Sequence, residues 1–320
     1  MAYPSYIDAF KHKILHQRAQ TALEMLEKCR ICPRKCGVNR LKGEKGFCRT
    51  GRMPIVCSYF AHHGEEPSIS GTRGSGTIFF SRCNLRCVYC QNYSFSQLEE
   101  GRETPVEELA DYMLSLQKEG CHNINFVTPT HVMPQILEAL IPAIEGGLSI
   151  PLVYNTSGYE TLEALKLLEG IVDIYLPDMR YADNAYAVEY SNAPGYAEYN
   201  QAAVKEMFRQ VGTAKIDKEG LIVKGLIVRH LVLPQNIAGS EKIFAFIARE
   251  ISPQIPISLM SQYFPEFEAQ KHAPLDRVLT LEEYEAAVGL LEKYGLENGW
   301  IQESGGLKRF AGTNIKRNIE

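Results

Sequence analysis

The sequence predicts an α/β protein, a partial (β/α)6 TIM-type barrel that follows an N-terminal cysteine-rich module. Short apolar strands alternate with helices from Gly76 onward, in about six β-α units where a closed barrel has eight. Residues 29–75 are instead rich in Gly, Pro and Cys with little periodicity, which is typical of loops tied to a metal. We therefore expect an N-terminal helix and metal module over residues 1–75, the barrel core over 76–300, and a tail over 301–320.

The expected elements follow one another along the chain as helix, loops, and then strand and helix in turn. Residues 1–28 are predicted to form the first helix. Buried parallel strands, apolar because both of their faces are covered, are predicted at 76–81, 123–128, 151–156, 172–176, 220–234 and 256–264, the fifth with room for a hairpin at its start. Helices are predicted at 131–145, 159–169, 183–190, 197–211 and 240–250. Two more are predicted from their N-terminal signals: one after Thr104, with Pro105 at its first position and Glu107 completing a capping box, and one after Thr280, with Glu283 as capping partner.

The composition excludes several classes of protein. The net charge of −4 offers no broad basic field, so neither nucleic acid nor an anionic membrane is expected as a partner. No run of 18 apolar residues is present, and the N-terminus does not resemble a secretory signal, so we expect a cytoplasmic protein. Thiols stay reduced there, and seven of the nine cysteines fall into two groups, which indicates metal binding. Cys57 and Cys121 stand alone and are expected to be small buried side chains.

Polar residues follow each predicted strand, and in a parallel barrel such residues meet at one rim, where the chemistry takes place. The segments that we expect at this rim are the cysteine loop 83–90, then 128–131, 155–159, 177–180, 229–236 and 261–264.

Cys83, Cys87 and Cys90 are spaced C-x3-C-x2-C directly after the first predicted strand. Thiolates favour zinc, copper(I) or iron–sulfur clusters. Zinc would need a fourth ligand, for which His131 or His230 is available, although His230 is better explained as a structural histidine. A cubane [4Fe–4S] cluster held by three thiolates would instead keep one iron open for a substrate or cofactor.

The segment "CNLRCVYCQN" after the first strand resembles the radical S-adenosylmethionine (SAM) superfamily, in particular its pyruvate formate-lyase activating enzyme-like branch. The wider text, with "GEEPSISGTRGSGTIFFSRCNLRCVYCQN", "VTPTH" and "LMSQYFP", resembles an uncharacterised subfamily of activating-enzyme homologues over roughly residues 29–310. The resemblance implies that Cys83, Cys87 and Cys90 hold a [4Fe–4S] cluster whose open iron binds SAM. The reduced cluster would cleave SAM to methionine and a 5′-deoxyadenosyl radical.

The resemblance also implies which other residues bind SAM. Tyr89 matches the aromatic position beside the adenine, and Asn92 the asparagine just after the cluster loop. Asp178 and Arg180 match the Asp-x-Lys that follows the fourth strand in activating enzymes, and Arg229 matches an arginine of the fifth strand. Asn155, Thr156 and Ser157 match the polar exit of the third strand, and Ser157 with Glu160 also predicts a helix capping box.

One motif departs from the family pattern. Thr128, Pro129, Thr130 and His131 stand where the family usually has Gly-Gly-Glu, so the hydroxyls of Thr128 and Thr130 are expected to accept from the SAM ammonium. "GEEP" at 64–67 imitates the missing motif, but it precedes the first strand. We therefore expect Glu65 and Glu66 to be solvated loop carboxylates.

Cys29, Cys32, Cys36 and Cys48 form a complete set of four ligands, spaced C-x2-C-x3-C-x11-C. Zinc would need nothing more, and a second [4Fe–4S] cluster that relays electrons to the first is served equally well. Lys35, Arg40, Lys42 and Lys45 lie among these cysteines and are expected to be solvated.

The predicted function is that of a radical SAM oxidoreductase that resembles an activating enzyme. It would take electrons from a donor such as flavodoxin or ferredoxin and abstract hydrogen from a glycine of a partner glycyl-radical protein. One alternative is radical modification of another peptide or of a small molecule. A non-enzymatic zinc or electron-transfer protein is disfavoured, because a carrier would normally close its cluster with a fourth ligand.

Overall fold

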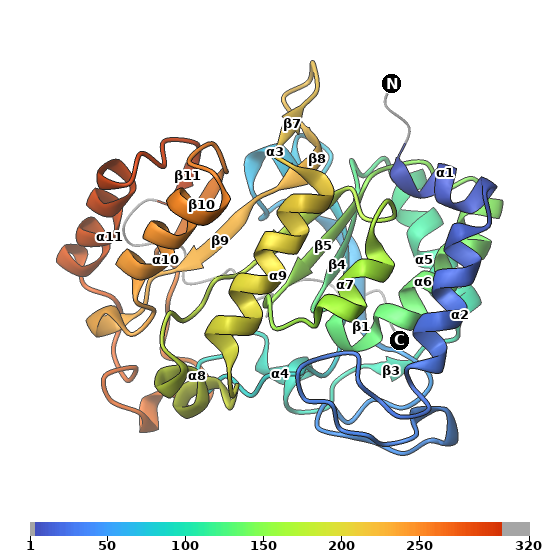
Figure 1. Ribbon diagram of the computed structural model, residues 1–320, viewed down its shortest axis with the longest axis horizontal. Helices are drawn as coiled ribbons and strands as arrows, with labels where there is room; N and C mark the ends of the chain where they lie inside the picture. Colours follow the sequence, from blue (N-terminus) through green and yellow to red (C-terminus); the bar gives the residue numbers. More distant parts are fainter. Residues whose placement is uncertain (1–3, 303–320) are drawn as a thin grey trace.

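The computed structural model describes residues 4–302, and its centre is a curved, mostly parallel sheet (Figure 1). Six predicted strands are present, the fifth in two pieces: β2 (Ser75–Phe80), β4 (Ile124–Val127), β5 (Leu152–Thr156), β6 (Ile174–Pro177), β8 (Ile222–Leu226) with β9 (Val228–Leu231), and β10 (Ile257–Met260). These strands pair in parallel in chain order, and a parallel bridge between Asp178 and Arg229 joins β6 to β9. The prediction of a partial TIM-type barrel is confirmed.

The two edges of the sheet were not predicted. β1 (Ile55–His62) pairs antiparallel with β2, so the sheet extends into the segment that the sequence analysis assigned to loops. β11 (Gly299–Ile301) adds a parallel strand beside β10 at the other edge. Two short strands, β3 (Arg102–Glu103) and β7 (Lys215–Ile216), pair with β1 and β8, and the β7–β8 pair is the hairpin allowed by the sequence.

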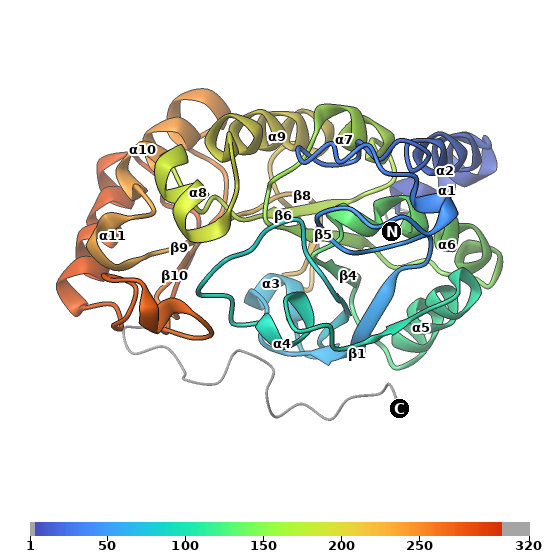
Figure 2. The same cartoon turned by 90° about the horizontal axis from the view of Figure 1, so that it is seen from below.

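Helices cover the outer, convex face of the curved sheet (Figures 1 and 2). The covering helices are α5 (Val106–Lys118), α6 (Met133–Glu145), α7 (Leu162–Leu168), α9 (Tyr196–Val211), α10 (Ser240–Phe246), which continues as a π-turn (Ile247–Ile251), and α11 (Leu281–Lys293). Short helices α3 (Pro67–Ser70), α4 (Tyr93–Ser96) and α8 (Asn184–Ser191) belong to the connecting loops.

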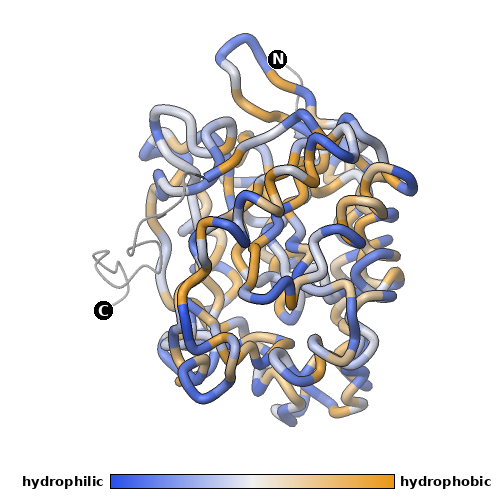
Figure 3. The backbone as a smooth tube through the Cα atoms, turned by 90° about the vertical axis from the view of Figure 1, so that its left-hand side faces the viewer, coloured by the Kyte–Doolittle hydropathy of each residue, from blue (hydrophilic) through white to orange (hydrophobic). Residues whose placement is uncertain are grey.

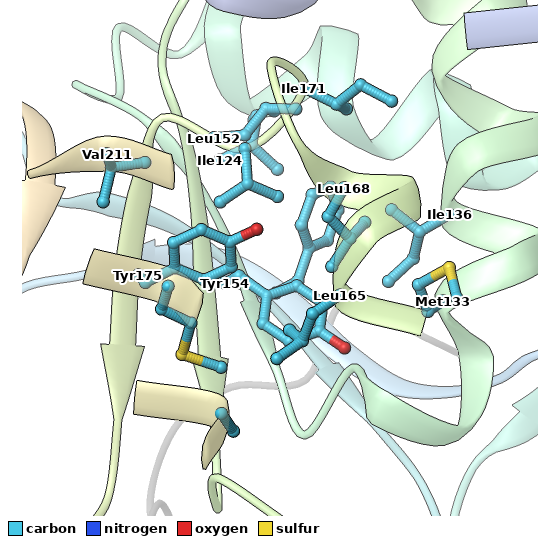
Figure 4. Packing of buried hydrophobic residues seen from close by; sticks show 14 of the residues in the cluster. Ile124, Met133, Ile136, Leu152, Tyr154, Leu165, Leu168, Ile171, Tyr175 and Val211 are labelled. Atoms are coloured by element: carbon cyan, nitrogen blue, oxygen red, sulfur yellow. The ribbon is translucent and has the colours of Figure 1, made fainter. Parts of the chain in front are cut away.

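The main core lies between the sheet and these helices. Leu152 and Tyr154 of β5 and Tyr175 of β6 pack against Leu165 and Leu168 of α7 (Figure 4). Hydrophobic segments run through the interior and hydrophilic ones lie mostly at the peripheral loops (Figure 3). Cys121 is buried in this core and Cys57 is buried on β1, as predicted for both.

Three predictions concern where helices begin and end. Two of them are wrong and one is confirmed. The first helix is two helices, α1 (Ser5–Lys11) and α2 (Ile14–Glu24), because Lys13 between them adopts a left-handed φ of 59°. The expected capping box at Thr104 is wrong, since α5 begins at Val106 with Pro105 as N-cap and no side-chain cap. The box of Thr280 and Glu283 at α11 is confirmed in both of its hydrogen bonds.

The cysteine-rich loops pack on the rim of the barrel next to the carboxyl ends of the strands (Figure 1). Arg40, which begins a short 3-10 turn (Arg40–Lys42), is only 1% exposed. Its guanidinium donates to the carbonyl oxygens of Gly51 (3.0 and 3.1 Å) and His131 (2.8 Å), so the expectation of a solvated Arg40 is wrong.

Within residues 4–302, no helix combines the length and the apolar character that a membrane span requires. Of the tail predicted over 301–320, Ile301 belongs to β11, and the residues beyond Gln302 lie outside the described ones.

Candidate functional site

A cavity of about 660 Å³ lies inside the curved sheet. At one end it is lined by the cysteine loop that follows β2, and at the other by the loop that joins β1 to α3. These two ends lie at opposite ends of the sheet, as the positions of α4 and α3 in Figure 1 show. We call them the cysteine end, which contains Cys83, Cys87 and Cys90, and the acid end, which contains Glu65 and Glu66.

The three cysteines of the rim loop all line the cavity, as predicted from their place after the first strand. Each sulfur has at least one polar group within hydrogen-bond distance. The backbone N–H of Leu85 donates to Cys83 Sγ at 3.3 Å, the Ser191 hydroxyl donates to Cys87 Sγ at 3.0 Å, and Ser96 Oγ lies 3.2 Å from Cys90 Sγ. Such donors stabilise the thiolate form that binds metal.

Burial acts against the thiolates when no metal compensates for it. It raises the pKa of Cys83 to about 12 and that of Cys90 to about 11, and in both cases the nearby Cys87 raises it further. Arg180 partly opposes this shift, because its Nη1 lies 3.5 Å from Cys87 Sγ. These thiols are therefore expected to release protons as a metal centre binds.

The donor set fits an iron–sulfur cluster. Among the residues that the structure describes, no three His, Cys, Asp or Glu side chains lie close enough together to hold a single metal ion. A cubane cluster does not require such a group, because each thiolate binds a different iron. Three thiols on one loop, each with its own hydrogen-bond partner, are suited to three corners of a cluster.

Tyr89 and Asn92 line the cavity beside these cysteines. Tyr89 is 3% exposed, its hydroxyl accepts a 2.7 Å hydrogen bond from Tyr181, and its ring lies 5.8 Å from that of Tyr263. Tyr89 is therefore packed against neighbouring aromatic rings and also lines the cavity. Asn92 precedes α4 without capping it through its side chain, so its amide remains available to the cavity.

The two threonines after β4 are placed differently from each other. Thr128 lines the cavity and has a left-handed φ of 61°, which is strained for a β-branched residue. Thr130 is 1% exposed and is not among the lining residues; its hydroxyl donates to Glu160 Oε1 at 2.5 Å. A direct role in ligand binding is therefore open to Thr128 but not supported for Thr130.

The exit of β5 brings Asn155, Thr156 and Ser157 to the cavity wall, and the Ser157 hydroxyl has no hydrogen-bond partner. The capping box predicted for Ser157 and Glu160 is wrong, because Thr161 caps α7. Glu160 is instead buried at 2% exposure and accepts 2.5 Å hydrogen bonds from Thr130 and Thr156. Burial raises its pKa to about 7, which the two hydroxyls only partly oppose.

Asp178, Arg180 and Arg229 connect the two ends of the cavity wall. Arg180 donates to Asp178 Oδ2 at 2.5 Å, and Arg229 Nε lies 3.7 Å from Asp178 Oδ1. Arg180 faces Cys87, whereas Arg229 faces the acid end, where it donates to Glu65 Oε2 at 3.2 Å. Burial opposes the charge of both arginines, but the surrounding carboxylates raise the pKa of each.

Sequence reasoning missed the acid end. Glu65 and Glu66 were expected to be solvated, yet their side chains are only 7% and 5% exposed and both line the cavity. The antiparallel β1 returns the chain to the start of β2, which puts the loop at 63–67 under the barrel. Glu65 accepts from Asn125 of β4 at 3.2 Å, and burial raises its pKa to about 7. The sequence held one signal for this end of the cavity, the resemblance of "GEEP" to the family's Gly-Gly-Glu motif.

The two histidines that were candidate zinc ligands both make hydrogen bonds with other protein groups. His230 is fully buried, with Nδ1 2.8 Å from the carbonyl oxygen of Met179 and Nε2 2.9 Å from Ser240 Oγ, which confirms its structural role. His131 Nε2 lies 2.9 Å from the carbonyl oxygen of Ser81. Burial lowers the pKa of His131 to about 3 and that of His230 to about 4.

The four N-terminal cysteines are neighbours in the module, although in the described residues no three of them lie close enough to hold a single metal ion. Cys29, Cys32 and Cys48 are buried and Cys36 is half-buried. Burial raises the pKa of Cys29 and of Cys32, and the neighbouring thiols of the set contribute to both shifts. Gly46 approaches so closely that a Cβ there would lie 2.8 Å from Cys36 Sγ, and the next N–H, of Phe47, reaches that sulfur at 3.4 Å.

Two arginines lie between this set and the rim loop. The guanidinium carbon of Arg34 is 3.6 Å from the centre of the Phe47 ring, and that of Arg86 is 4.6 Å from it. Arg34 also donates to the carbonyl oxygen of Asn84, and Arg86 to those of Phe47 and Cys83. The module is thus joined to the cysteine loop through the Phe47 ring and the two arginines that contact it.

Comparison with known proteins adds a family and two relatives. A model described as the radical SAM superfamily matches residues 77–228. The chain is 32% identical over 303 residues to the uncharacterized protein MJ0674 of Methanocaldococcus jannaschii. The aligned region covers 91% of this chain and 82% of that protein. It is 24% identical to the uncharacterized protein MJ0808 of the same organism, over 86% and 80% of the two chains. Among solved structures, HydG, a maturase of the [FeFe]-hydrogenase, is similar over 70% of this chain and 50% of its own, with a TM-score of 0.48 and 13% identity.

Proposed function

This chain belongs to the radical SAM superfamily, and on that premise we propose that it abstracts a hydrogen atom from a glycine of a partner protein, as a glycyl-radical activating enzyme does. The observation that carries the proposal is the cavity itself. Three cysteines line one end of it, and strand-end polar groups continue along its wall to a second, separate end. This arrangement has room for a cofactor and for a substrate in one enclosure.

The family's cofactors are a [4Fe–4S] cluster and SAM. Cys83, Cys87 and Cys90 would hold the cluster, leaving one iron to SAM. When bound, the two supply reductive cleavage of SAM to methionine and a 5′-deoxyadenosyl radical, for which an external electron donor, here proposed to be flavodoxin or ferredoxin, is needed.

The chain's own residues position and shield this chemistry. Ser191, Ser96 and the Leu85 N–H hold the three sulfurs. Arg180 places a positive charge beside Cys87, where it can meet a ligand carboxylate, and Asn155, Ser157, Asp178 and Arg229 offer further polar contacts along the wall. Tyr89 contributes a buried aromatic ring to the cavity wall.

Anaerobic reconstitution tests the first half of the proposal. The wild-type chain, reduced with dithionite, is expected to convert SAM to 5′-deoxyadenosine, and Cys87→Ala is expected to abolish this conversion. Cys121→Ala, which removes a buried thiol far from the rim loop in sequence, is the matched control and should retain it. A soundly reconstituted wild-type chain that cleaves no SAM would contradict the proposal.

Electron paramagnetic resonance tests the second half. A glycyl-radical signal is expected when the reduced enzyme and SAM are mixed with the correct partner protein. SAM cleavage coupled to oxidation of a small molecule or of another peptide residue would support the alternative reading. The acid end favours that alternative in one respect, because a glycine has no side-chain charge for Glu65 and Glu66 to recognise.

For the second cysteine set we propose a redox centre or a structural zinc, held by Cys29, Cys32, Cys36 and Cys48. The contact through Arg34, Phe47 and Arg86 supports the redox reading, since it brings the set next to the rim loop. Metal analysis distinguishes the two. Roughly eight irons per chain, falling to roughly four in Cys29→Ser/Cys32→Ser, indicate a second cluster, and one zinc beside four irons indicates a structural site.

A further inference from the structure

We propose that the acid end of the cavity binds a positively charged group of the substrate, an ammonium or guanidinium. This inference rests on the proposed function, because it assumes that the cofactors occupy the cysteine end. It names the chemistry that the substrate must carry, which neither the sequence motifs nor the relatives specify.

Carboxyl groups outnumber guanidinium groups at the acid end. Three carboxylates surround Arg229: Glu65 Oε2 lies 3.2 Å from its Nη1, and Glu66 Oε1 and Asp178 Oδ1 lie 3.6 and 3.7 Å from its Nε. Asp178 also pairs with Arg180, which is turned toward Cys87. Arg229 is thus the guanidinium that Glu65 and Glu66 share, and the raised pKa of Glu65 keeps that carboxyl partly protonated near neutral pH. The nearby His62 does not supply a second cation, since burial and Arg229 lower its pKa to about 4.

Glu66 carries an unused acceptor into this space. The residue is 7% exposed, and its Oε2 atom is buried with no hydrogen-bond partner. Glu66 stands at the N-cap position of α3, yet its side chain does not cap that helix and lines the cavity instead. A buried carboxylate oxygen without a donor is costly, so an incoming N–H group at this point would recover a strong charge-assisted hydrogen bond.

The walls around the acid end suit an organic cation. Phe60 and Phe79 stack with their ring centres 5.3 Å apart, and His62 meets both of these rings edge-on. Phe60 and Phe79 line the cavity from β1 and β2, and Trp300 lines it from β11 at the opposite edge of the sheet. Aromatic faces attract ammonium and guanidinium groups and bury their methylene stems.

The position of the acid end assigns it to the substrate. Glu65 bonds to Asn125, the second residue of β4, whereas the cysteine loop follows the last residue of β2. A cofactor held by Cys83, Cys87 and Cys90 therefore occupies the opposite end of the same cavity. The molecule that is attacked must enter the remaining part, where Glu66 Oε2 is an unpartnered carboxylate oxygen.

Binding of simple probes tests the inference without turnover. The reconstituted full-length chain with SAM is titrated anaerobically with cadaverine and with 1,5-pentanediol, which has the same length but no charge. Calorimetry and the emission of Trp300, the single tryptophan of the chain, follow occupancy. We expect cadaverine to bind at least about tenfold more tightly than the diol, and Glu66→Gln to remove about that factor.

Glu66→Asp and Glu282→Gln are the matched variants. Aspartate keeps the negative charge, so Glu66→Asp should still prefer cadaverine over the diol. A preference that is kept in Glu66→Asp and lost in Glu66→Gln shows that the effect comes from the charge and not from unfolding. Glu282 is exposed in α11, so its variant should bind like wild type. Equal binding of cadaverine and the diol by the wild-type chain, or an unchanged preference in folded Glu66→Gln, would overturn the inference.

Two further readouts separate this inference from the proposed function and identify the source of the cation. Release of 5′-deoxyadenosine is measured independently: cation binding without SAM cleavage contradicts only the proposed function, and cleavage without cation preference contradicts only this inference. N-acetyl-lysine methylamide serves as the peptide-like probe. Its binding more tightly than cadaverine supports a protein-borne lysine, and the reverse supports a small amine.

Discussion

At the scale of single residues, the site depends on polar groups held away from water. Glu65, Glu66 and Glu160 are buried carboxylates, and only the first has a guanidinium within hydrogen-bond distance. Burial of such groups is tolerated where function or a local network requires it. Their titration is therefore expected to be visible in the stability of the whole chain.

The pH dependence of stability tests Glu160. Its pKa is raised from an ordinary 4.5 to about 7, so the folded chain binds the proton more tightly than the unfolded chain. Stability is then lost as pH rises from about 4.5 to about 7, by at most about 3 kcal/mol for this group. Glu160→Gln mimics the protonated form and should flatten the dependence in urea unfolding between pH 5.5 and pH 8. Glu65 titrates in the same window, so Glu65→Gln is the companion, and an unchanged slope in both variants would count against these assignments.

The strained backbone at Thr128 allows a matched pair of substitutions. Thr128→Gly and Thr128→Ala both remove the hydroxyl, but glycine alone accepts the φ of 61° without penalty. We expect the glycine variant to be more stable than the alanine variant by about 1 kcal/mol in chemical unfolding. Both should bind SAM more weakly than wild type if the hydroxyl contacts this ligand. Equal stability of the pair would mean that the strain is relieved elsewhere.

At the scale of elements, the cysteine-rich module is held on the barrel by a few buried bonds. Arg40 reaches across to the start of α6 and the Arg34–Phe47–Arg86 stack reaches to the rim loop. Few regular elements lie between Glu24 and Ile55, so the module depends on such contacts and on its metal. The contacts that dock the module on the barrel place Cys29, Cys32, Cys36 and Cys48 next to the rim loop with Cys83, Cys87 and Cys90.

Arg40→Met tests this docking. The substitution keeps the apolar stem but removes donors to the carbonyl oxygens of Gly51 and His131, and should lower the unfolding free energy by about 2–4 kcal/mol. Limited proteolysis is expected to cut first within residues 25–54. Arg30→Met removes an exposed ion pair with Glu163 and should change stability by less than about 1 kcal/mol. Equal effects of the two variants would show that Arg40 does not anchor the module.

At the scale of the whole molecule, the barrel is open and its two edges share one cavity. Cys57 and Phe60 of β1 and Trp300 of β11 all line it, although they are far apart in the chain. The cysteine loop reaches the second edge as well, since Gln91 donates to the carbonyl oxygen of Gln262, whose side chain bonds to Gln302. Both edges of the sheet therefore form walls of the same cavity.

Hydrogen exchange tests this arrangement. Binding of SAM to the reconstituted chain is expected to slow amide exchange in peptides covering both β1 and β11, measured by mass spectrometry. Strand β7 of the β7–β8 hairpin, Lys215–Ile216, is exposed and does not line the cavity, so its exchange should remain unchanged. Slower exchange confined to the cysteine loop would contradict a shared cavity.

The parts of the protein that the sequence by itself determined are those encoded by neighbouring residues. Strand and helix alternation, the capping box at Thr280 and the cysteine loop after β2 depend on local periodicity and spacing, so the core strands and the cysteine end were predictable. The branch of the family and the partner protein stay proposals, because spacing within one loop does not define what enters the cavity.

Only the tertiary structure decided the acid end and the bond from Thr130 to Glu160. Two glutamates in a loop have the same local pattern whether they are solvated or buried. Their burial follows from β1, which pairs antiparallel with β2 and carries Glu65 and Glu66 beneath the barrel to Arg229, 164 residues from Glu65 along the chain. Long-range pairing of this kind leaves no periodic signal, because its free energy comes from contacts between segments and not from the residues within one.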